Sequence, residues 1–456
     1  MKPVAQAPPA INPHELEKTP VEMLIMSIDL GSTQFKAGIF AAGTDGALRP
    51  KSFGSRSLRY RYGADGVVEL EAAVVIEALR GAITDALEQS AADPRDLRAI
   101  AMTSQGQTFT VVDAQGVPRR PFISWRDSRS GETCVTMSQL AEFADFAEHS
   151  SFCSLIPNLQ VCILGHLRKD PGWHVAPDEQ VLKLPSFFVR ELTDEAWIDD
   201  NLAAMSGLYS LKEKNWWPAA LSYCALRPTQ LPCIAAMGAV VATTTSRASR
   251  YGLPAGVPVI LAGNDQTAGA YGAQVHRQKA MLMTLGTALV AYACFDEMPT
   301  ATPVLIRGPY LGGLNYAMVA DDGGGGLIGW ACTVLAHCHD YDEFFTQAES
   351  APPGCLGLVF HLDLMEGRGR WDGIAMAHTP AHFARAVLEG LVRRQAAMVH
   401  DLGIDPSRTP VWAAGGGSRR PLWTRMLGDT LGTDVTVVSA NPLLGAASIA
   451  LSGVAE

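Results

Sequence analysis

The chain has 456 residues, of which 48% are hydrophobic and 18% charged, which is enough for a large core and for two or three domains. Its formal net charge of −10 and its pI near 5.6 argue against general binding to nucleic acid or to anionic membranes, so we expect small-molecule partners. The nine cysteines form no CxxC pair, which predicts a reducing compartment without disulfides, namely the cytoplasm.

The first stretch, residues 1–22, contains five prolines and lacks the apolar centre of a signal peptide. We predict a disordered tail, with Met23 or Met26 as an alternative start of translation.

From Leu24 the sequence LIMSIDLGSTQFKAGIF predicts a hairpin. An apolar strand reaches Asp29, a Gly-Ser-Thr turn follows, and a second strand begins near Phe35. Backbone N–H groups and hydroxyls in such a turn can hold a phosphate.

Residues 71–90 have the apolar periodicity of a helix, and residues 97–102 predict a strand that runs into the polar cluster 103–107. Residues 111–125 predict a further hairpin, closed by Arg126-Asp127-Ser128-Arg129. A Trp beside two Arg and an Asp can line a sugar pocket, or it can be a core Trp beside a surface ion pair. The sequence leaves both alternatives open.

Seven prolines divide residues 140–235 into short helices and loops. We expect no catalytic or binding residue there.

The stretch VPVILAGNDQTAGAYG from Val257 predicts a buried strand that delivers Asp265 to the start of a helix. Strand ends that feed helices carry the chemistry of many α/β folds, although an Asp in this position can also be a simple helix N-cap. Next, MLMTLGTALVAYACF from Met281 repeats the order of the first hairpin. Two such hairpins suggest an internal duplication, in which each half supplies one turn to a nucleotide, with two unrelated hairpins as the alternative.

Gly324, Gly326 and Gly329 satisfy the GxGxxG pattern after a predicted strand at 315–320, with Glu343 downstream. This pattern alone would suggest a dinucleotide-dependent oxidoreductase. The pattern is short, and Glu343 lies in a polar segment instead of at a strand end, so we favour other functions. The His337-Cys338-His339 run points its side chains apart on a helix, which disfavours a metal site.

The whole chain from about Met26 resembles the FGGY carbohydrate kinases, the family of xylulokinase, ribulokinase and glycerol kinase. The resemblance is carried, in family order, by IDLGSTQFKAGIF, AIAMTSQGQTFTVVDAQGVPRRPFISWRDSR, MSGLYSLKEKNW, VILAGNDQTAGAYG, TLGTA, GGGGLIGW, ARAVLEGLV, AAGGGSRRPLWTRMLGDTLGTDV and NPLLGAASIAL. It implies an α/β, two-domain, actin-like fold of duplicated ribonuclease H-like design, with the nucleotide in the cleft between domains. The implied domains are 23–275, which holds the sugar and the catalytic base, and 276–456, which holds the nucleotide.

The resemblance also implies roles for single residues. Asp265 corresponds to the general base, Gln266 to a neighbouring sugar contact, and Asp29 to the acid that holds Mg²⁺. Further sugar contacts correspond to Gln105, Gly106 and Gln107. Nucleotide contacts correspond to Gly31, Ser32, Thr33, Lys36, Gly286, Thr287, Gly325, Gly416, Gly417 and Arg420.

The implied activity is ATP-dependent phosphorylation of a small sugar, with Mg²⁺ and with a pentulose such as xylulose as acceptor. A polyol or another ketose (glycerol, erythritol, ribulose) is the alternative, and a non-catalytic sugar sensor is a more distant one. Homodimerisation also stays open. The chain departs from relatives at Gln107, where they commonly carry His or Glu, at Gln160 in place of Lys, in the segment from His361, and at Asn441-Pro442. A neutral amide at position 107 can donate and accept hydrogen bonds but cannot ionise, so the sugar is open.

Overall fold

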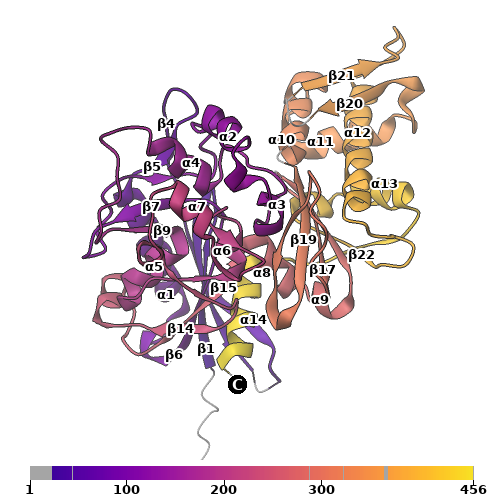
Figure 1. Cartoon of the computed structure of the whole chain (residues 1–456). Helices are drawn as coiled ribbons and strands as arrows, with labels where there is room; N and C mark the ends of the chain where they lie inside the picture. Colours follow the sequence, from indigo (N-terminus) through magenta and orange to yellow (C-terminus); the bar gives the residue numbers. More distant parts are fainter. Residues whose placement is uncertain (1–22, 44, 287, 322, 364–367, 455–456) are drawn as a thin grey trace, which may run out of the picture.

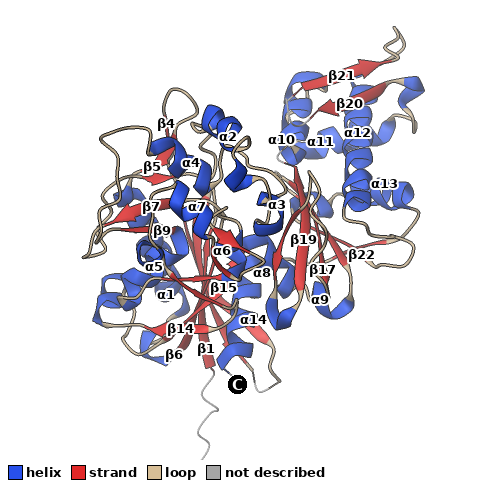
Figure 2. Cartoon of the chain, in the orientation of Figure 1, coloured by secondary structure: helices blue, strands red, loops and turns tan. Residues whose placement is uncertain are grey.

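The computed structural model describes residues 23–43, 45–286, 288–321, 323–363 and 368–454, which form two lobes (Figure 1). The predicted tail, 1–22, and Thr287 lie outside the described residues. Helices flank the strands in both lobes (Figure 2). None of the helices in the described ranges combines the length and the apolar character needed to cross a bilayer.

The first lobe is built on a six-stranded sheet that is antiparallel at both ends and parallel in its middle. Its strands, in spatial order, are β14 (Val240–Thr243), β15 (Pro258–Asn264), β6 (Leu97–Ser104), β1 (Met23–Leu30), β2 (Gln34–Ala42) and β3 (Leu48–Ser57). The predicted first hairpin is therefore confirmed as β1 and β2.

The second lobe has a six-stranded sheet of related design. Its strands, in spatial order, are β18 (Ile306–Pro309), β19 (Asn315–Asp321), β17 (Leu289–Phe295), β16 (Met281–Leu285), β22 (Val411–Ala414) and β23 (Val435–Val437). The second hairpin, β16 and β17, is likewise antiparallel, and β22 lies parallel to β16 just as β6 lies parallel to β1. The repeated plan supports the predicted duplication.

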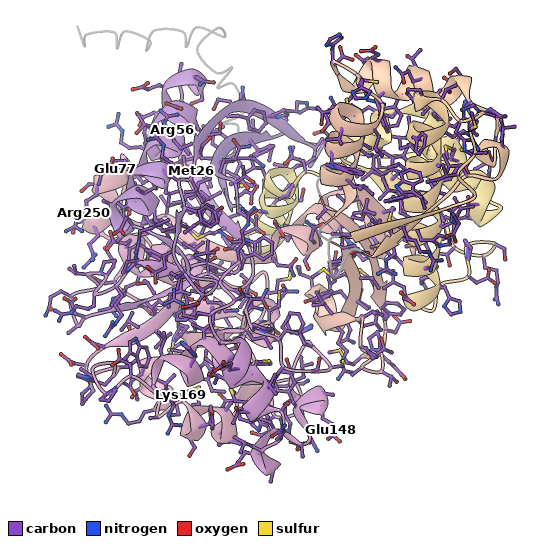
Figure 3. All side chains as sticks on the ribbon, turned by 90° about the horizontal axis from the view of Figure 1, so that it is seen from above. Met26, Arg56, Glu77, Glu148, Lys169 and Arg250 are labelled. Carbon is purple, nitrogen blue, oxygen red and sulfur yellow. The ribbon has the colours of Figure 1, made fainter. Side chains whose placement is uncertain are left out.

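Alternating side chains bury both faces of the first sheet. Met26 and Ile28 face α1 (Ala72–Ser90) and α5 (Leu184–Thr193), whereas Ile25 faces α14 (Pro442–Val454). Met26 lies inside this lobe, while Lys169 and Glu148 lie at its periphery (Figure 3). This period of two is what a strand covered on both sides requires.

The last helix, α14, returns to the first lobe (Figure 1). It crosses α8 (Asp265–Gly272) so closely that a Cβ on Gly445 would meet the Ala268 carbonyl oxygen at 1.7 Å. The contact therefore requires glycine at position 445. The predicted division of the chain at 275/276 stays a prediction, but α14 belongs spatially with the first sheet.

The second sheet lies between helices of its own lobe and the first lobe. One face packs on α10 (Gly324–Trp330), α11 (Tyr341–Ser350), α12 (Pro380–Asp401) and α13 (Pro421–Leu431). The other face carries Tyr292 and Tyr316, whose rings stack at 5.4 Å and join the core of the first lobe. The two lobes therefore share a buried, apolar contact.

The remaining elements are short and lie mostly in the first lobe. They are β4 (Arg61–Tyr62), β5 (Val68–Leu70), β7 (Phe109–Val112), β8 (Phe122–Ile123), α2 (Gly131–Met137), α3 (Phe146–His149), α4 (Gln160–Leu167), β9 (Gln180–Lys183), β10 (Trp197–Asp199), α6 (Asp200–Ala204), β11 (Tyr209–Ser210), β12 (Asn215–Trp216), α7 (Pro218–Tyr223), β13 (Cys233–Ala235), α9 (Val275–Gln278), β20 (Val359–Asp363) and β21 (Arg368–Asp372). The hairpin predicted over 111–125 is confirmed as β7 and β8, which pair at Phe109 and Ile123.

Candidate active site

Three parallel strands of the first sheet end side by side and bring the predicted chemistry together. Asp29 on β1 lies opposite Thr103 on β6, and Ser104 on β6 lies opposite Asn264 on β15. Asp265 follows directly as the first residue of α8. The carboxyl ends of parallel strands in α/β sheets are the usual place for ligands, so this edge is the candidate site.

Asp265 is not the N-cap of its helix. The side chain of Asn264 accepts the Thr267 backbone N–H at 2.9 Å and so caps α8. Asp265 accepts the N–H of Gln266 at 2.8 Å and keeps its second oxygen for other partners. The N-cap alternative for Asp265 is therefore wrong, and its carboxylate is available for chemistry.

The pKa of Asp265 is suited to a base at neutral pH. Burial, and next the charge of Asp29, raise it from 3.8 to about 7, although the hydrogen bond from the Gln266 N–H and the charge of Lys36 oppose the rise. A general base works best when its pKa lies near the working pH. The negative charge of Asp29 therefore helps to hold the proton on Asp265.

Asp29 has one engaged and one unpartnered oxygen. Its Oδ2 lies 3.2 Å from Lys36 Nζ, whereas its Oδ1 is buried with no hydrogen-bond partner among the described residues. Burial also raises the pKa of this carboxyl, and Lys36 only partly offsets that. A buried carboxylate oxygen without a partner fits a hard cation, which would supply the missing contact.

The turn after β1 is tied to the rest of the site through its carbonyl groups. The Gly31 carbonyl accepts Gln105 Nε2 at 3.3 Å, the Ser32 carbonyl accepts the Tyr60 hydroxyl, and the Thr33 carbonyl accepts the Leu58 N–H at 2.9 Å. With its carbonyls engaged, the turn is fixed, and its backbone N–H groups are of the kind that can bind an anion.

The predicted sugar segment, 105–107, lies beside that turn. Gln107 donates from Nε2 to the Met205 carbonyl, and its buried Oε1 has no partner within the described ranges. A Cβ on Gly106 would lie 3.1 Å from Met205 Cε, so the backbone passes close to that side chain. An acceptor that is buried and unpartnered suits a hydroxyl of a ligand.

The sequence left two alternatives open for the segment from Trp125 to Arg129, a sugar pocket or a core Trp beside an ion pair. Different residues of the segment match different alternatives. Asp127 is fully buried, accepts the Val68 N–H at 2.7 Å and pairs with Arg129, which also reaches Glu69 at 2.6 Å. These residues form a structural ion network. The indole N–H of Trp125, in contrast, is buried without a partner in the described structure.

The glycines predicted to hold the nucleotide gather at one edge of the second sheet. The Gly325 N–H, at the start of α10, donates to the Gly286 carbonyl at 2.8 Å. A Cβ on Gly417 would lie 3.0 Å from Leu285 Cβ, and a Cβ on Gly416 would face open space. Arg420 pairs with Asp342 on α11 and is therefore engaged within its own lobe.

Residues 140–235, where we expected no catalytic or binding residue, support the site from behind. Asp199 accepts the Gly263 N–H at 3.3 Å, and Asn201 accepts the Asn264 N–H at 3.0 Å, so both hold the strand end before Asp265. The sequence did carry a signal for this support. Two acids and an amide stand at the end of the short strand β10, just as polar residues stand at the ends of β1 and β6.

The helix that carries Asn201 is itself fixed by a buried charged residue. Lys183 Nζ donates to the Leu202 carbonyl at 2.7 Å, and burial lowers the pKa of this amine to about 7. Burial raises the pKa of Asp199 to about 7 as well. The two groups lie in the same desolvated layer under α6, where each opposes the shift of the other.

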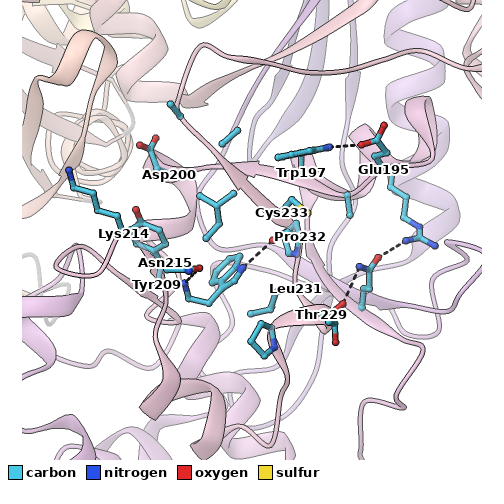
Figure 4. A pocket seen from close by; sticks show the side chains of 18 of the residues that line it. Glu195, Trp197, Asp200, Tyr209, Lys214, Asn215, Thr229, Leu231, Pro232 and Cys233 are labelled. Carbon is cyan, nitrogen blue, oxygen red and sulfur yellow. Dashed lines mark hydrogen bonds between the residues drawn. The ribbon is translucent and has the colours of Figure 1, made fainter.

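A pocket of about 990 Å³ lies on the other side of α6 (Figure 4). It contains two indoles whose N–H groups are satisfied, Trp197 by Glu195 at 3.0 Å and Trp216 by the Pro232 carbonyl at 3.1 Å. Asp200 lines it, next to Asn201 in the chain. None of the predicted site residues that the structure describes lines this pocket, so it is separate from the strand-end site.

Comparison with known proteins decides the family. A model of the N-terminal domain of the FGGY family of carbohydrate kinases matches residues 24–272, and the model of the C-terminal domain matches residues 355–454. The chain belongs to the FGGY family of carbohydrate kinases. Members use ATP as phosphate donor, generally with a divalent metal ion.

Relatives that are named for different phosphate acceptors are about equally similar to this chain in sequence. An L-fuculokinase of Salmonella typhi is 26% identical over 79% of this chain and 78% of its own length. A xylulose kinase of Staphylococcus epidermidis is 23% identical over 95% and 88%, and a glycerol kinase of Trichlorobacter lovleyi is 26% identical over 93% and 89%. These relatives identify a sugar kinase without distinguishing its sugar.

The fold is shared with solved sugar kinases. The structure of xylulose kinase from Rhodospirillum rubrum superposes with a TM-score of 0.84 at 21% identity, covering 94% of this chain and 90% of that one. The predicted two-domain, actin-like sugar-kinase fold is thereby confirmed. Membership of this kinase family also sets aside the oxidoreductase alternative for Gly324 to Gly329.

Proposed function

We propose that this FGGY kinase transfers the γ-phosphoryl group of ATP to a hydroxyl of a small sugar, with a pentulose of the xylulose type as its acceptor. The observation that carries the proposal is the Asp265 carboxylate, whose pKa is raised to about 7 at a strand end shared with Asp29. A base with this pKa can take a proton from a sugar hydroxyl and is about half ionised at neutral pH.

Each part of the strand-end site has a task in the transfer. Asp265 accepts the hydroxyl proton, and Gln107 and Gln266 orient the sugar. The first turn offers N–H groups to the phosphates, and Lys36 offsets their charge. Phosphoryl transfer needs positioning and charge compensation more than covalent help from the protein, which is what this set of groups supplies.

Mg²⁺ is the proposed metal, and Asp29 is the residue that would hold it through its buried, unpartnered Oδ1. Bound there, the ion would neutralise negative charge on the phosphates. The proposed nucleotide contacts of the second lobe are Gly286, Thr287, Gly325, Gly416, Gly417 and Arg420, of which Thr287 lies outside the described residues.

The acceptor is tested by a coupled ADP-release assay with a panel of ketoses and polyols that includes xylulose, ribulose, fuculose, erythritol and glycerol. We expect the highest kcat/KM with a pentulose. A higher kcat/KM with glycerol or erythritol would replace the pentulose by the polyol alternative, and the absence of turnover with every acceptor would remove this substrate class.

A further inference from the structure

Arg126 lies between two aromatic rings at the edge of the candidate site. Its guanidinium carbon is 5.3 Å from the centre of the Tyr60 ring and 5.4 Å from the Trp125 ring. The side chain is exposed, and its backbone N–H donates to Ser124 Oγ at 3.1 Å. Contacts with ring faces hold a guanidinium in place without using its N–H donors.

The charge of Arg126 is not neutralised by any acid in the described part of the chain. In the described ranges no ion pair includes it, whereas Arg129, three residues later, pairs with both Asp127 and Glu69. The chain carries a net charge of −10, so acidic side chains that could pair with an arginine are abundant in its sequence. The five N–H donors of Arg126 are therefore available to an anion from outside the chain.

Tyr60 connects this cation to the first turn. Its hydroxyl donates to the Ser32 carbonyl, and its ring receives Arg126. Burial raises the pKa of Tyr60, while the charge of Arg126 and hydrogen bonds with Ser124 and Gln105 oppose the shift. One side chain therefore contacts the turn, the sugar segment and the guanidinium.

A second connection runs through Trp125. Its backbone N–H donates to Thr108 Oγ1 at 3.1 Å, and that hydroxyl donates to Gln105 Oε1 at 3.2 Å. The loop that carries Arg126 is thus fixed to the sugar segment. The free guanidinium lies where the proposed sugar segment meets the proposed phosphate turn.

From this placement we infer that Arg126 binds the phosphoryl group on the sugar side of the cleft, first during its transfer and then as the phosphate of the product. The inference rests on the proposed function. In the transfer, the bond from the γ-phosphorus to the β,γ-bridging oxygen breaks, a bond to the sugar oxygen forms, and the hydroxyl proton passes to Asp265. The planar fork of Arg126 matches two phosphoryl oxygens.

The test compares Arg126→Gln and Arg126→Lys with Arg120→Gln. Arg120 is the matched control because it too is exposed, unpaired with any described acid and held by a ring, that of Trp173 at 5.7 Å. Three quantities are measured: kcat in the ADP-release assay, the Kd of free D-xylulose, and the Kd of D-xylulose 5-phosphate, both Kd values by calorimetry.

We expect Arg126→Gln to lower kcat by roughly 10- to 100-fold and to weaken sugar-phosphate binding by a similar factor, with the Kd of the free sugar changed less than about twofold. Arg126→Lys should recover part of both losses, because it restores the charge but not the fork. Arg120→Gln should match the wild-type protein in all three quantities.

An equal loss of affinity for free xylulose and for its phosphate would overturn the inference, because Arg126 would then recognise the sugar itself. Wild-type values for Arg126→Gln would overturn it as well. Failure of the proposed function is a separate outcome: the wild-type protein would phosphorylate no sugar. Calorimetry with the sugar phosphate would still decide whether Arg126 binds phosphate.

Discussion

Asn201 Oδ1 accepts two hydrogen bonds from Asn264, one from its backbone N–H at 3.0 Å and one from its Nδ2 at 2.8 Å. Asn264 in turn caps α8, whose first residue is Asp265. The position of the proposed base is therefore set by α6, a five-residue helix about 60 positions earlier in the chain.

Asn201→Ala should loosen this position. The substitution leaves two donors of Asn264 unpaired in a buried place, which should lower the free energy of unfolding by about 1–3 kcal/mol. We expect kcat to fall about tenfold or more with little change in the KM for ATP, because a small displacement of a base slows proton transfer. Urea unfolding and the ADP-release assay measure the two effects.

Asn215→Ala is the control for that substitution, because Asn215 is an exposed residue of the pocket in Figure 4. Among the described residues, its Oδ1 accepts a hydrogen bond from the neighbouring Trp216 N–H alone. If Asn201→Ala lost stability but kept wild-type kcat, Asn201 would be a structural residue with no part in positioning Asp265.

Asp265→Asn should abolish most turnover while the protein stays folded. General bases contribute roughly 10²–10⁴-fold to rate, and an amide cannot take the proton. ATP affinity, measured by calorimetry, should stay within a few-fold of the wild-type value, since the proposed nucleotide contacts lie on other elements. A folded variant with near-normal turnover would remove Asp265 from the role of base.

The same substitution should raise stability above neutral pH. The folded-state pKa of Asp265 is about 7 against an ordinary 3.8, so the folded chain retains a proton that the unfolded chain has lost. The ionised carboxylate therefore lowers the free energy of unfolding. This loss is absent near pH 4, grows as the pH rises, and is complete above about pH 7. Asp265→Asn should be more stable by about 2 kcal/mol at pH 8, after allowance for lost contacts.

Unfolding curves at pH 4.5 and pH 8 check that prediction. The stability of the variant relative to the wild-type protein should rise between pH 4.5 and pH 8. A constant difference at both values would mean that the pKa of Asp265 is close to its ordinary value, and Asp265 would then lack the burial on which its role as base depends.

The first-lobe part of the site could be predicted from sequence because each strand there has a polar residue at or next to its end. Asp29 and Asp265 each follow an apolar run that marks a buried strand, so these runs located both residues. Asn201 was missed because the strand before its helix, β10, has three residues, too few for a periodic pattern. The return of α14 to the first lobe depends on the contact of Gly445 with α8, which no local pattern encodes.

Gln107 should decide which sugars are accepted. Its Nε2 is engaged by the Met205 carbonyl, so its unpartnered Oε1 is the atom left for a substrate hydroxyl. Gln107→Ala should lower kcat/KM for the preferred sugar by about tenfold, the worth of one hydrogen bond, and leave the KM for ATP unchanged. Gln107→His should instead change the order of preference among ketoses. If both variants matched the wild-type protein on every sugar, segment 105–107 would not contact the acceptor.

Closure of the two lobes is expected when both substrates bind. The described contacts between lobes include the Tyr292 hydroxyl with Thr267 Oγ1 at 3.0 Å and Asn201 Nδ2 with the Pro309 carbonyl at 2.9 Å. These contacts join α8 and α6 to the second sheet, next to Asp265, and so provide a pivot close to the proposed base.

A nucleotide held by glycines of the second lobe reaches a sugar held by the first lobe only if the lobes approach about such a pivot. Small-angle scattering should show a smaller radius of gyration with sugar and a non-hydrolysable ATP analogue together than with either alone, because the ternary complex favours the closed state. An unchanged radius with both ligands bound would mean that the described arrangement of lobes is already the productive one.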